Sequence, residues 1–285
     1  MGKTMAVIGG DLRQIHLARL LLEDGRDVVT WGLEHGGGPC AVPMTEALER
    51  DVLIFPLPVC RGGQLNLPLG EARPEPERLW SRIAFHRLLL GGMTGELSGR
   101  LLKDYGLTML DYFDREELQV ANAAITAEGA LQRLMEETED TLLGSTVLVV
   151  GFGRIGKLLA RRLQALGAHV SVSARRSDDL AWAQALGYRA LHTGQLEGEL
   201  GRFDMICNTV PARVLPGRLL AQTDSACLLL ELASEPGGMD PEAARVLKRR
   251  LIRAPGLPGL AAPRAAAKAV RDTLYHILEE RGESI

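Results

Sequence analysis

The sequence has little cysteine, and its cysteines form no metal-binding or disulfide pattern. Among 285 residues the four cysteines are widely spaced and have no histidine at ligand spacing: Cys40, Cys60, Cys207 and Cys227. Structural zinc sites need cysteine or histidine pairs a few residues apart, and disulfide frameworks need dense cysteine. We therefore expect no metal site and expect reduced thiols, which are typical of cytoplasmic proteins.

Long apolar runs and a charge excess are also missing. No apolar segment approaches the ~20 residues that span a bilayer, and the chain starts with a strand-like segment, Thr4 to Gly9, where a signal peptide would have a long apolar region. Lys and Arg number 33 against 36 Asp and Glu, a net charge of −3, which gives no electrostatic reason to expect a nucleic acid. We expect a soluble cytoplasmic protein with no membrane and no nucleic-acid partner.

What the sequence does contain is a repeated order of strand, glycine turn and helix. A β-type run from Met5 leads into Gly9-Gly10-Asp11 and a helix, and a second run from Thr146 leads into Gly151 and another helix. Strands that alternate with helices indicate parallel sheets buried on both faces. We predict an α/β chain of two tandem Rossmann-like or flavodoxin-like parallel-sheet domains.

The boundary between the predicted domains falls in a long helical pattern, roughly residues 116–143. We expect this pattern to be interrupted near residues 122–126, because Thr126-Ala-Glu-Gly129 has the hydroxyl and acidic residues of a helix start. Residues 62–76 are rich in Pro and Gly and are predicted to be a surface loop. A last helix, from about residue 265, is expected to return to the first domain. The domains are then 1–122 with about 265–285, and 123–264.

The second glycine turn is a G-x-G-x-x-G motif between a β-branched strand and a helix. Gly151 makes the tight turn, Gly153 lets the backbone approach a pyrophosphate, and Gly156 allows the helix to pack closely on the strand. The amides of the helix start face the anion. We predict that a dinucleotide binds here and also contacts Arg154 and Ile155. The alternative is a glycine turn without a ligand.

Arginine occupies the position at which NAD enzymes have an acidic residue. Arg175 lies 24 positions after Gly151 and is followed by Arg176 and Ser177. A carboxylate there would repel a 2′-phosphate, whereas a guanidinium pairs with it. These three residues are predicted cofactor contacts, and they favour NADP over NAD. The alternative is a pair of solvated arginines at a strand end.

Further loops are expected to border the same crevice. In open α/β sheets, ligands bind beyond the carboxyl ends of the strands. The loops at three such ends supply the remaining predicted cofactor contacts: Asn208, Thr209, Val210, Pro211, Ala233, Ser234, Gly256 and Pro258. The alternative for each loop is a Pro/Gly segment needed only for its turn.

The first glycine turn lacks the dinucleotide spacing. Arg13 and Gln14 stand at the start of the following helix, where a guanidinium and backbone amides could hold a carboxylate. Arg13 could equally pair with Asp11 or lie in solvent, and spacing alone does not separate these alternatives.

Together these motifs resemble the family of dipicolinate synthase A subunits over nearly the whole chain. More distantly, the order of segments is similar to D-2-hydroxyacid dehydrogenases and S-adenosylhomocysteine hydrolases. The residues that carry the first resemblance are Gly9-Gly10-Asp11-x-Arg13-Gln14, Thr126-Ala-Glu-Gly129, Gly151 to Gly156, Ala174-Arg175, Asn208-Thr-Val-Pro211, Glu231 to Gly238 and Ala254 to Gly259.

The resemblance implies an NADP-dependent oxidoreductase of spore formation, in the cytoplasm of the mother cell. With a flavoprotein-like B subunit it would form dipicolinate (pyridine-2,6-dicarboxylate) from dihydrodipicolinate or 4-hydroxy-tetrahydrodipicolinate. The small dicarboxylate substrate would be held by the first domain, and the candidate base is Glu128. Assembly into a homo-oligomer is left open. The implied substrate-binding residues are Gly10, Asp11, Arg13, Gln14, Gly92 and Thr94, and the candidate catalytic residues are Arg13, Thr126 and Glu128.

Two alternative functions are weighed against this one. A D-2-hydroxyacid dehydrogenase-like NADP oxidoreductase acting alone would need a histidine acid/base late in the second domain, and no histidine lies between His192 and His276. A non-catalytic NADP-binding regulatory subunit is compatible with the sequence, because a cofactor motif is visible while a complete set of base and substrate ligands is not.

Overall fold

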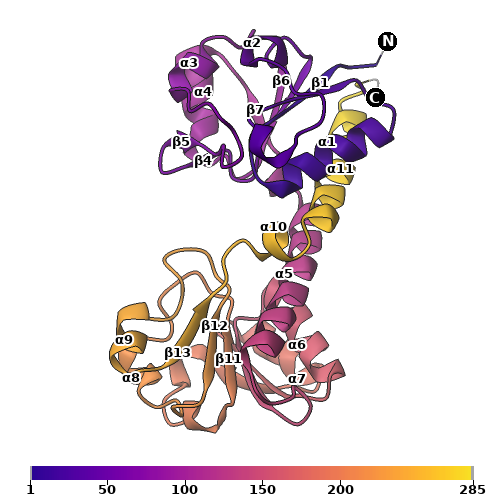
Figure 1. Ribbon diagram of the computed structural model, residues 1–285. Helices are drawn as coiled ribbons and strands as arrows, with labels where there is room; N and C mark the ends of the chain where they lie inside the picture. The colour runs from indigo at the N-terminus through magenta and orange to yellow at the C-terminus, as the bar shows by residue number, and fades with distance from the viewer. Residues whose placement is uncertain (1, 284–285) are drawn as a thin grey trace. The chain divides into compact units, whose positions relative to one another are not determined.

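The structure is a computed structural model that describes residues 2–283 (Figure 1). The chain divides into two compact units. The first contains the residues up to Asn122 and those from Ala262 onward, and the second is Ala123–Ala261. No helix in the described part of the chain is long and apolar enough to cross a membrane. All four cysteines are free thiols, and burial raises the pKa of Cys207 to about 12.

The first unit is a five-stranded parallel sheet in the order β2-β1-β3-β6-β7. Counted along the unit, this is the 2-1-3-4-5 order of flavodoxin-like folds, and the order reverses between β1 and β3. Its strands are β1 (Met5–Ile8), β2 (Val28–Trp31), β3 (Val52–Ile54), β6 (Leu88–Gly91) and β7 (Met109–Asp111). A separate antiparallel hairpin is formed by β4 (Cys60–Arg61) and β5 (Gln64–Leu65).

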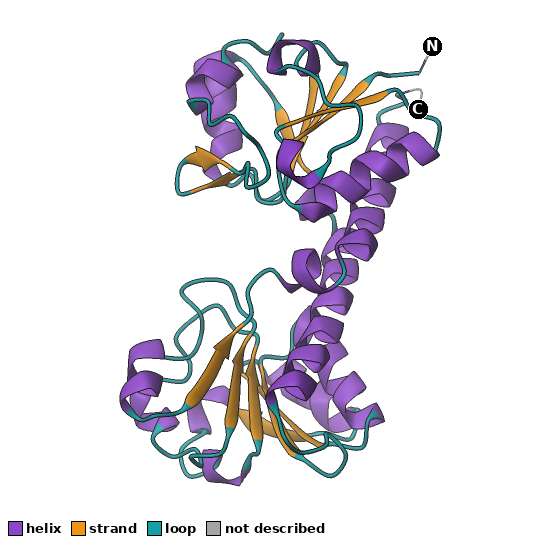
Figure 2. Cartoon of the chain, viewed as in Figure 1, coloured by secondary structure: helices purple, strands orange, loops and turns teal. Residues whose placement is uncertain are grey.

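Helices cover both faces of this sheet, as Figure 2 shows. Successive residues of β1 point to opposite faces, so that Met5 and Val7 join one apolar cluster while Ala6 and Ile8 join the other. The first cluster lies under α1 (Leu12–Glu23) and α11 (Pro263–Glu280). The second lies under α2 (Met44–Ala47), α3 (Pro76–Trp80) and α4 (Glu96–Tyr105).

The C-terminal helix returns to the first unit, as predicted. Helix α11 packs on α1 through buried Val270, Leu274 and Ile277. The hydroxyl of Tyr275 donates a 2.8 Å hydrogen bond to Asp24. Burial of this apolar face, rather than helix propensity, accounts for most of the stability of such a contact.

The second unit is a six-stranded parallel sheet in the order β10-β9-β8-β11-β12-β13. Counted along the unit, this is the 3-2-1-4-5-6 order of dinucleotide-binding folds, and the order reverses between β8 and β11. The strands are β8 (Thr146–Val150), β9 (His169–Ala174), β10 (Arg189–His192), β11 (Met205–Asn208), β12 (Leu228–Glu231) and β13 (Arg250–Arg253). The predicted fold class is therefore confirmed for both sheets.

Helices of the second unit also lie on both faces of its sheet. The residues of α5 (Glu116–Glu137) that belong to this unit share one apolar cluster with α6 (Arg154–Ala165) and α7 (Ser177–Ala185). The other face is covered by α8 (Gly217–Leu220) and α9 (Pro241–Val246). A short helix, α10 (Leu257–Ala261), follows β13.

Three local predictions were wrong. Helix α5 is continuous and ends at Glu137, so that Thr126 lies inside the helix and does not cap a helix start. The stretch around it is rich in alanine, a strong helix former, and buried packing of Ala127 and Ala130 holds it. Residues 62–76 are not loop throughout, because β5 lies among them. The Pro/Gly segment after β13 becomes helical from Leu257.

Candidate functional site

The glycine turn after β8 requires glycine at two positions for reasons internal to the protein. Gly151 has φ 97°, in the left-handed region, and a Cβ there would lie 2.4 Å from the Thr209 hydroxyl oxygen. A Cβ on Gly156 would lie 2.0 Å from the Gly151 carbonyl oxygen. Gly151 therefore makes the turn, and Gly156 lets α6 approach it.

The middle glycine of the motif has no such internal reason. Gly153 is exposed, has φ −78°, and a Cβ there would meet no atom within 4 Å. It is the N-cap of α6 and offers no capping side chain, although the first amides of any helix lack partners within the helix. Open space in front of a helix start fits the close approach of a pyrophosphate. Arg154 and Ile155 lie in the first turn of this helix.

The two arginines after β9 differ in their partners. Arg176 is paired with the carboxylate of Asp178, with 2.9 Å between its Nε and Oδ1. Arg175 is exposed and forms no hydrogen bond or ion pair with any residue that the structure describes. Ser177 follows as the first residue of α7. Of these side chains, Arg175 is the one whose charge is available to a phosphate.

The loop after β11 crosses the point at which the strand order reverses. The Thr209 hydroxyl donates to the carbonyl of Val150, at the end of β8, over 3.0 Å. Asn208 is fully buried, and its side chain bonds both the carbonyl and the amide of Val210, at 2.9 and 3.2 Å. Pro211 is exposed at the edge of this loop. These bonds hold the loop beside the glycine turn.

A buried carboxylate holds the loop after β12, and the sequence analysis named it only as the first residue of a family motif, without a role. Glu231 is 3% exposed. One of its oxygens accepts from Asn208 Nδ2 at 2.6 Å and from the amide of Ala233 at 3.0 Å. The other accepts from the amides of Gly238 and Met239 at 2.8 and 2.9 Å. Four donors thus satisfy one carboxylate. Through these bonds Glu231 connects the ends of β11 and β12 with this loop.

The other predicted cofactor contacts, in the loops after β12 and β13, differ in their exposure to solvent. Ala233 is buried, and Ser234 is exposed at the rim of the loop. Gly256 is exposed and has φ 71°. Pro258 is buried within α10.

The first unit's glycine turn is covered by the chain itself. The amide of Gly10 donates to the carbonyl of Asn66 at 2.8 Å, and a Cβ on Gly9 would lie 2.2 Å from Leu67. Residues of the segment that carries the β4–β5 hairpin thus occupy the space that an anion would need. Of the two glycine turns that join a strand to a helix at Gly9-Gly10 and at Gly151–Gly156, only the second has open space in front of it.

Arg13 pairs with Asp11, which was one of the alternatives left open by the sequence. Arg13 Nε and Nη2 lie 2.9 and 2.8 Å from the two carboxylate oxygens, and Nη2 also donates to the Leu57 carbonyl at 2.7 Å. Burial alone would raise the pKa of Asp11, but the Arg13 hydrogen bonds and charge, with the charge of Arg61, lower it below its usual value. Gln14 is buried and donates to the Phe55 carbonyl at 3.3 Å.

Asp111 and Tyr112, at the end of β7, order the carboxyl edge of the first sheet. The sequence analysis missed both residues. Asp111 accepts hydrogen bonds from the amides of Met93 and Thr94 at 3.0 and 2.6 Å, and from the Thr94 hydroxyl at 3.0 Å. Tyr112 is fully buried, which raises the pKa of its phenol, and its hydroxyl donates to the Phe55 carbonyl at 2.9 Å. A Cβ on Gly92 would lie 2.7 Å from both Leu57 and Tyr112. The sequence could not reveal either role, because each depends on contacts with a strand end that is distant along the chain.

Thr126 and Glu128 lie inside α5 and not at the helix start where they were expected. Thr126 is buried within α5. Glu128 is exposed and forms a 3.2 Å ion pair with Arg162. Arg162 lies eight residues into α6, roughly 12 Å along the helix from its start. The continuity of α5 is the reason that this pair does not form a helix start.

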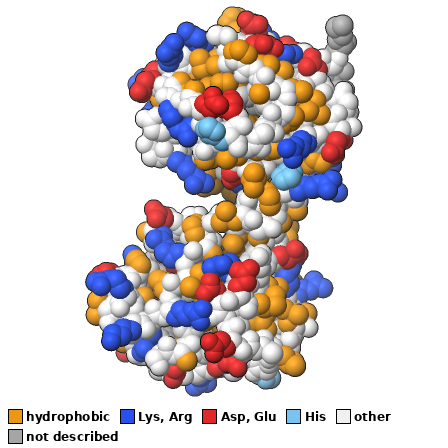
Figure 3. Space-filling view, in the orientation of Figure 1, with side chains coloured by type: hydrophobic (Ala, Val, Ile, Leu, Met, Phe, Trp, Pro, Cys, Tyr) orange, Lys and Arg blue, Asp and Glu red, His pale blue; other side chains and the backbone are white. Residues whose placement is uncertain are grey.

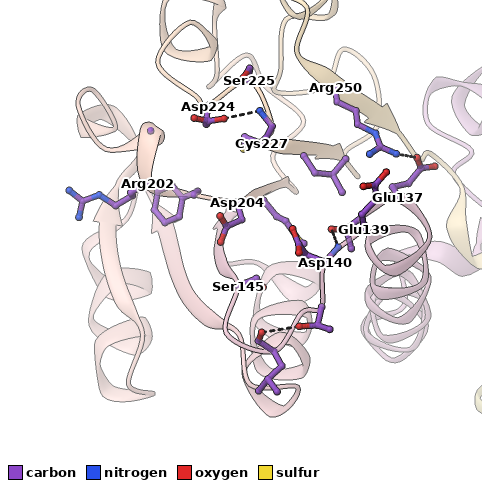
Figure 4. Close-up of a pocket in the computed structure, with 18 residues that line it drawn as sticks. Glu137, Glu139, Asp140, Ser145, Arg202, Asp204, Asp224, Ser225, Cys227 and Arg250 are labelled. Atoms are coloured by element: carbon purple, nitrogen blue, oxygen red, sulfur yellow. Dashed lines mark hydrogen bonds and ion pairs between the residues drawn. The ribbon is translucent and has the colours of Figure 1, made fainter.

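A cavity of about 660 Å³ lies at the opposite edge of the second sheet, where β11, β12 and β13 begin (Figure 4). Two of its acidic side chains are bonded within the protein. Glu137 pairs with Arg250 at 2.8 Å, and Asp204 accepts from the amide and hydroxyl of Thr146 at 2.7 Å each. No cluster of metal-ligating side chains occurs among the described residues. Because ligands of such sheets bind at the carboxyl edge, we assign no cofactor to this cavity.

Comparison with known proteins gives matches to both halves of the chain. The family model for the N-terminal domain of the dipicolinate synthase A subunit matches residues 4–113. The model "D-isomer specific 2-hydroxyacid dehydrogenase, NAD binding domain" matches residues 109–220, which include the G-x-G-x-x-G turn. The second unit is therefore a nicotinamide dinucleotide-binding domain by both geometry and similarity.

Dipicolinate synthase A subunits from two Bacillus species are similar to this protein over almost the full chain. The dipicolinate synthase A subunit of Bacillus subtilis (strain 168) is 31% identical over 288 residues, which cover 98% of this chain and 97% of that protein. The crystal structure of the same subunit from Bacillus halodurans has a TM-score of 0.87 and 29% identity, with 98% of each chain covered. The crystal structure of the Bacillus subtilis protein has a TM-score of 0.86 and 30% identity, with 98% and 97% covered.

Proposed function

Because the chain belongs to the family of dipicolinate synthase A subunits, we propose that it is the NADP-dependent catalytic subunit of a dipicolinate synthase. The single observation that supports this most is the open glycine turn at Gly153 with the unpaired charge of Arg175 after the next strand. A nicotinamide cofactor and a redox reaction follow from the family and the domain, whereas the preference for NADP is our inference from Arg175.

The proposed reaction is a two-electron oxidation that makes an aromatic ring. Dihydrodipicolinate would lose a hydride and a proton to become dipicolinate, and NADP⁺, held at the glycine turn and by Arg175, would supply the hydride acceptor. If the precursor is 4-hydroxy-tetrahydrodipicolinate, loss of water precedes the oxidation. Catalysis then depends on holding the ring in position and excluding water.

In this proposal the first unit binds the dicarboxylate at the carboxyl edge of its sheet, where the strand order reverses. Arg13 offers Nη1, which bonds no described residue, while Asp11 and Leu57 hold its other nitrogens. This pairing fixes the guanidinium in one orientation before substrate arrives. Loss of the ring proton needs a base, and the ion pair of Glu128 with Arg162 argues against Glu128 in that role.

We further propose that a flavoprotein-like B subunit is the partner and that the mother-cell cytoplasm of a spore-forming bacterium is the location. The names of the relatives support the existence of a partner subunit, since each is named as one lettered component of a synthase. The alternative of a 2-hydroxyacid dehydrogenase acting alone is less well supported. In the second unit, His169 begins β9 and His192 caps a turn at Gly194. Neither follows β12 or β13, late in the unit, where such an enzyme would need its histidine acid/base.

We predict that the chain and its partner together form dipicolinate from enzymatically generated 4-hydroxy-tetrahydrodipicolinate, with NADPH produced in equal amount. Product is followed by its ultraviolet absorbance and NADPH by its fluorescence, with each protein omitted in turn. If the pair binds NADP⁺ and yet makes no dipicolinate, the proposed reaction is wrong. Product from this chain alone would instead remove the partner from the proposal.

We also predict that the protein binds NADPH more tightly than NADH and that Arg175→Asp removes this preference. A charge-assisted hydrogen bond contributes about 1.5–3 kcal/mol, equivalent to roughly 10- to 100-fold in affinity. The matched control is Arg176→Ala, where the lost guanidinium is one already paired with Asp178. Titration calorimetry with both cofactors measures the preference. Equal affinities in the unaltered protein would contradict the role of Arg175.

A further inference from the structure

The β4–β5 hairpin stands where a substrate would approach the first unit. It directly follows β3, one of the two strands between which the strand order reverses, and ligands of such sheets bind at that point. Its strands, Cys60–Arg61 and Gln64–Leu65, are joined by Gly62 and Gly63. The hairpin is labelled in Figure 1 at the border of the first unit.

The base of the hairpin is firmly attached to the sheet edge. The amide of Val59 donates to the carbonyl of Gly92 at 3.1 Å, and the amide of Asn66 donates to Val59 at 2.9 Å. Asn66 in turn accepts from the amide of Gly10 at 2.8 Å, and its side chain donates to Pro58 at 2.9 Å. Buried Val59, Leu65 and Leu67 pack in the same place. The hairpin is thus tied to two turns of this unit, one at Gly10 and one at Gly92.

The tip of the hairpin carries a cation that the protein leaves unpaired. Arg61 is exposed, and its side chain forms no hydrogen bond or ion pair with any residue from 2 to 283. Gly62 and Gly63 beside it have positive φ, and a Cβ on either would meet no atom within 4 Å. Figure 3 shows Lys and Arg side chains interspersed with Asp and Glu over the visible face of the first unit.

Arg61 and the Asp11–Arg13 pair lie at the same edge of the first sheet, because the ladder partner of Arg61, Gln64, is two residues from Asn66, whose carbonyl accepts from the amide of Gly10 at 2.8 Å. Burial acts to raise the pKa of Asp11. Arg13 and, to a smaller degree, the charge of Arg61 lower this pKa below its usual value. The Asp11–Arg13 pair is itself close to neutral, because a carboxylate and a guanidinium are bonded through two pairs of atoms. A ligand with two carboxylates therefore needs a further positive charge at this edge.

We propose that Arg61 binds one carboxylate of the dicarboxylate substrate and thereby selects dicarboxylates over monocarboxylates. Arg13 Nη1 binds the other carboxylate. The hairpin acts as a fixed arm that holds the second cation at the mouth of the site, and the adjacent glycines leave room for the ring. This inference rests on the proposed function.

The test replaces Arg61 by glutamine in the complex of both proteins. We expect the KM for the dicarboxylate precursor to rise at least about 10-fold with kcat changed less than about 2-fold, because one charge-assisted carboxylate contact is lost from ground and transition state alike. Dipicolinate and pyridine-2-carboxylate are then compared as inhibitors. The unaltered enzyme should prefer dipicolinate, and Arg61→Gln should reduce that preference by at least about 10-fold.

Arg78→Gln is the matched control, since Arg78 is an exposed arginine on α3 of the same unit with no charged partner among the described residues. It should leave KM and the inhibitor preference unchanged. NADPH affinity should be equal in all three proteins, because the cofactor motif is in the second unit. If the unaltered complex makes dipicolinate and Arg61→Gln keeps both KM and inhibitor preference, the inference about Arg61 is overturned while the proposed function stands. A wild-type complex that makes no dipicolinate overturns both.

Discussion

Gly156→Ala is expected to reduce NADPH affinity by at least about 100-fold and to destabilise the second unit. The new Cβ would lie 2.0 Å from the carbonyl oxygen of Gly151, and a backbone atom cannot move away by changing a rotamer. Helix α6 must shift outward from β8 by about 1 Å or more. A misplacement of that size in a binding site costs on the order of 100-fold, and forced overpacking costs about 1–3 kcal/mol. Calorimetric titration and thermal unfolding measure the two effects.

Two further glycine variants separate the causes of this loss. Gly153→Ala should also prevent binding, because the methyl group fills the space kept for the pyrophosphate, but it should leave unfolding unchanged since no protein atom lies within 4 Å of it. Gly99→Ala, on the exposed face of α4 in the other unit, should leave binding intact and stabilise that helix by about 0.5–1 kcal/mol. Unchanged NADPH affinity in both Gly153→Ala and Gly156→Ala would refute the dinucleotide site.

The second large effect is expected for Glu231→Ala. This change removes the acceptor of four buried donors: Asn208 Nδ2 and the amides of Ala233, Gly238 and Met239. Each donor left without a partner costs about 1–3 kcal/mol unless water enters, so we expect the second unit to lose on the order of 4 kcal/mol. Hydrogen exchange at the amides of Gly238 and Met239 should accelerate most, because the loop is held there.

Two further variants test this prediction: one should reduce stability by an intermediate amount, and the other should have almost no effect. Glu231→Gln keeps the shape but turns an amide nitrogen toward backbone donors, so it should fall between alanine and the unaltered protein in stability. Glu235→Ala serves as control, since this exposed carboxylate contributes only a surface ion pair with Arg253 at 3.2 Å, which contributes under about 1 kcal/mol. NADPH affinity should fall with the stability of the loop. Normal exchange of the Gly238 amide in Glu231→Ala would show that the carboxylate does not hold the loop.

The features predicted well from the sequence are those in which chemistry and spacing are local. The run from Val147 to Val150 is continuous and apolar because a parallel strand is buried on both faces. The glycines that follow it are required by a turn and a helix start within six residues. The position of Arg175 after β9 follows from counting from that turn, since the strand has a standard length, and its contact with a phosphate stays a prediction.

The features missed depend on partners far away along the chain. Thr126 looked like a helix start because its neighbours allow that interpretation, yet packing of Ala127 and Ala130 in the second unit keeps the helix continuous. Asp111 and Glu231 are ordinary acidic residues in the sequence. They become ordering groups only because strand ends bring distant amides to them, those of Met93 and Thr94 in one case and of Gly238 and Met239 in the other.

By itself, the sequence determined that this is a two-unit α/β protein with one dinucleotide turn, and it contained the motifs of its family, because strand period, glycine spacing and strand-to-helix order are properties of short segments. Only the tertiary structure decided how the first glycine turn is used. The amide of Gly10 bonds Asn66, and Arg13 is held by both Asp11 and Leu57, so the turn is closed to a nucleotide and Arg61 stands beside it as an unpaired cation. Such outcomes depend on which backbone groups meet across a sheet edge, and no short stretch of sequence specifies that.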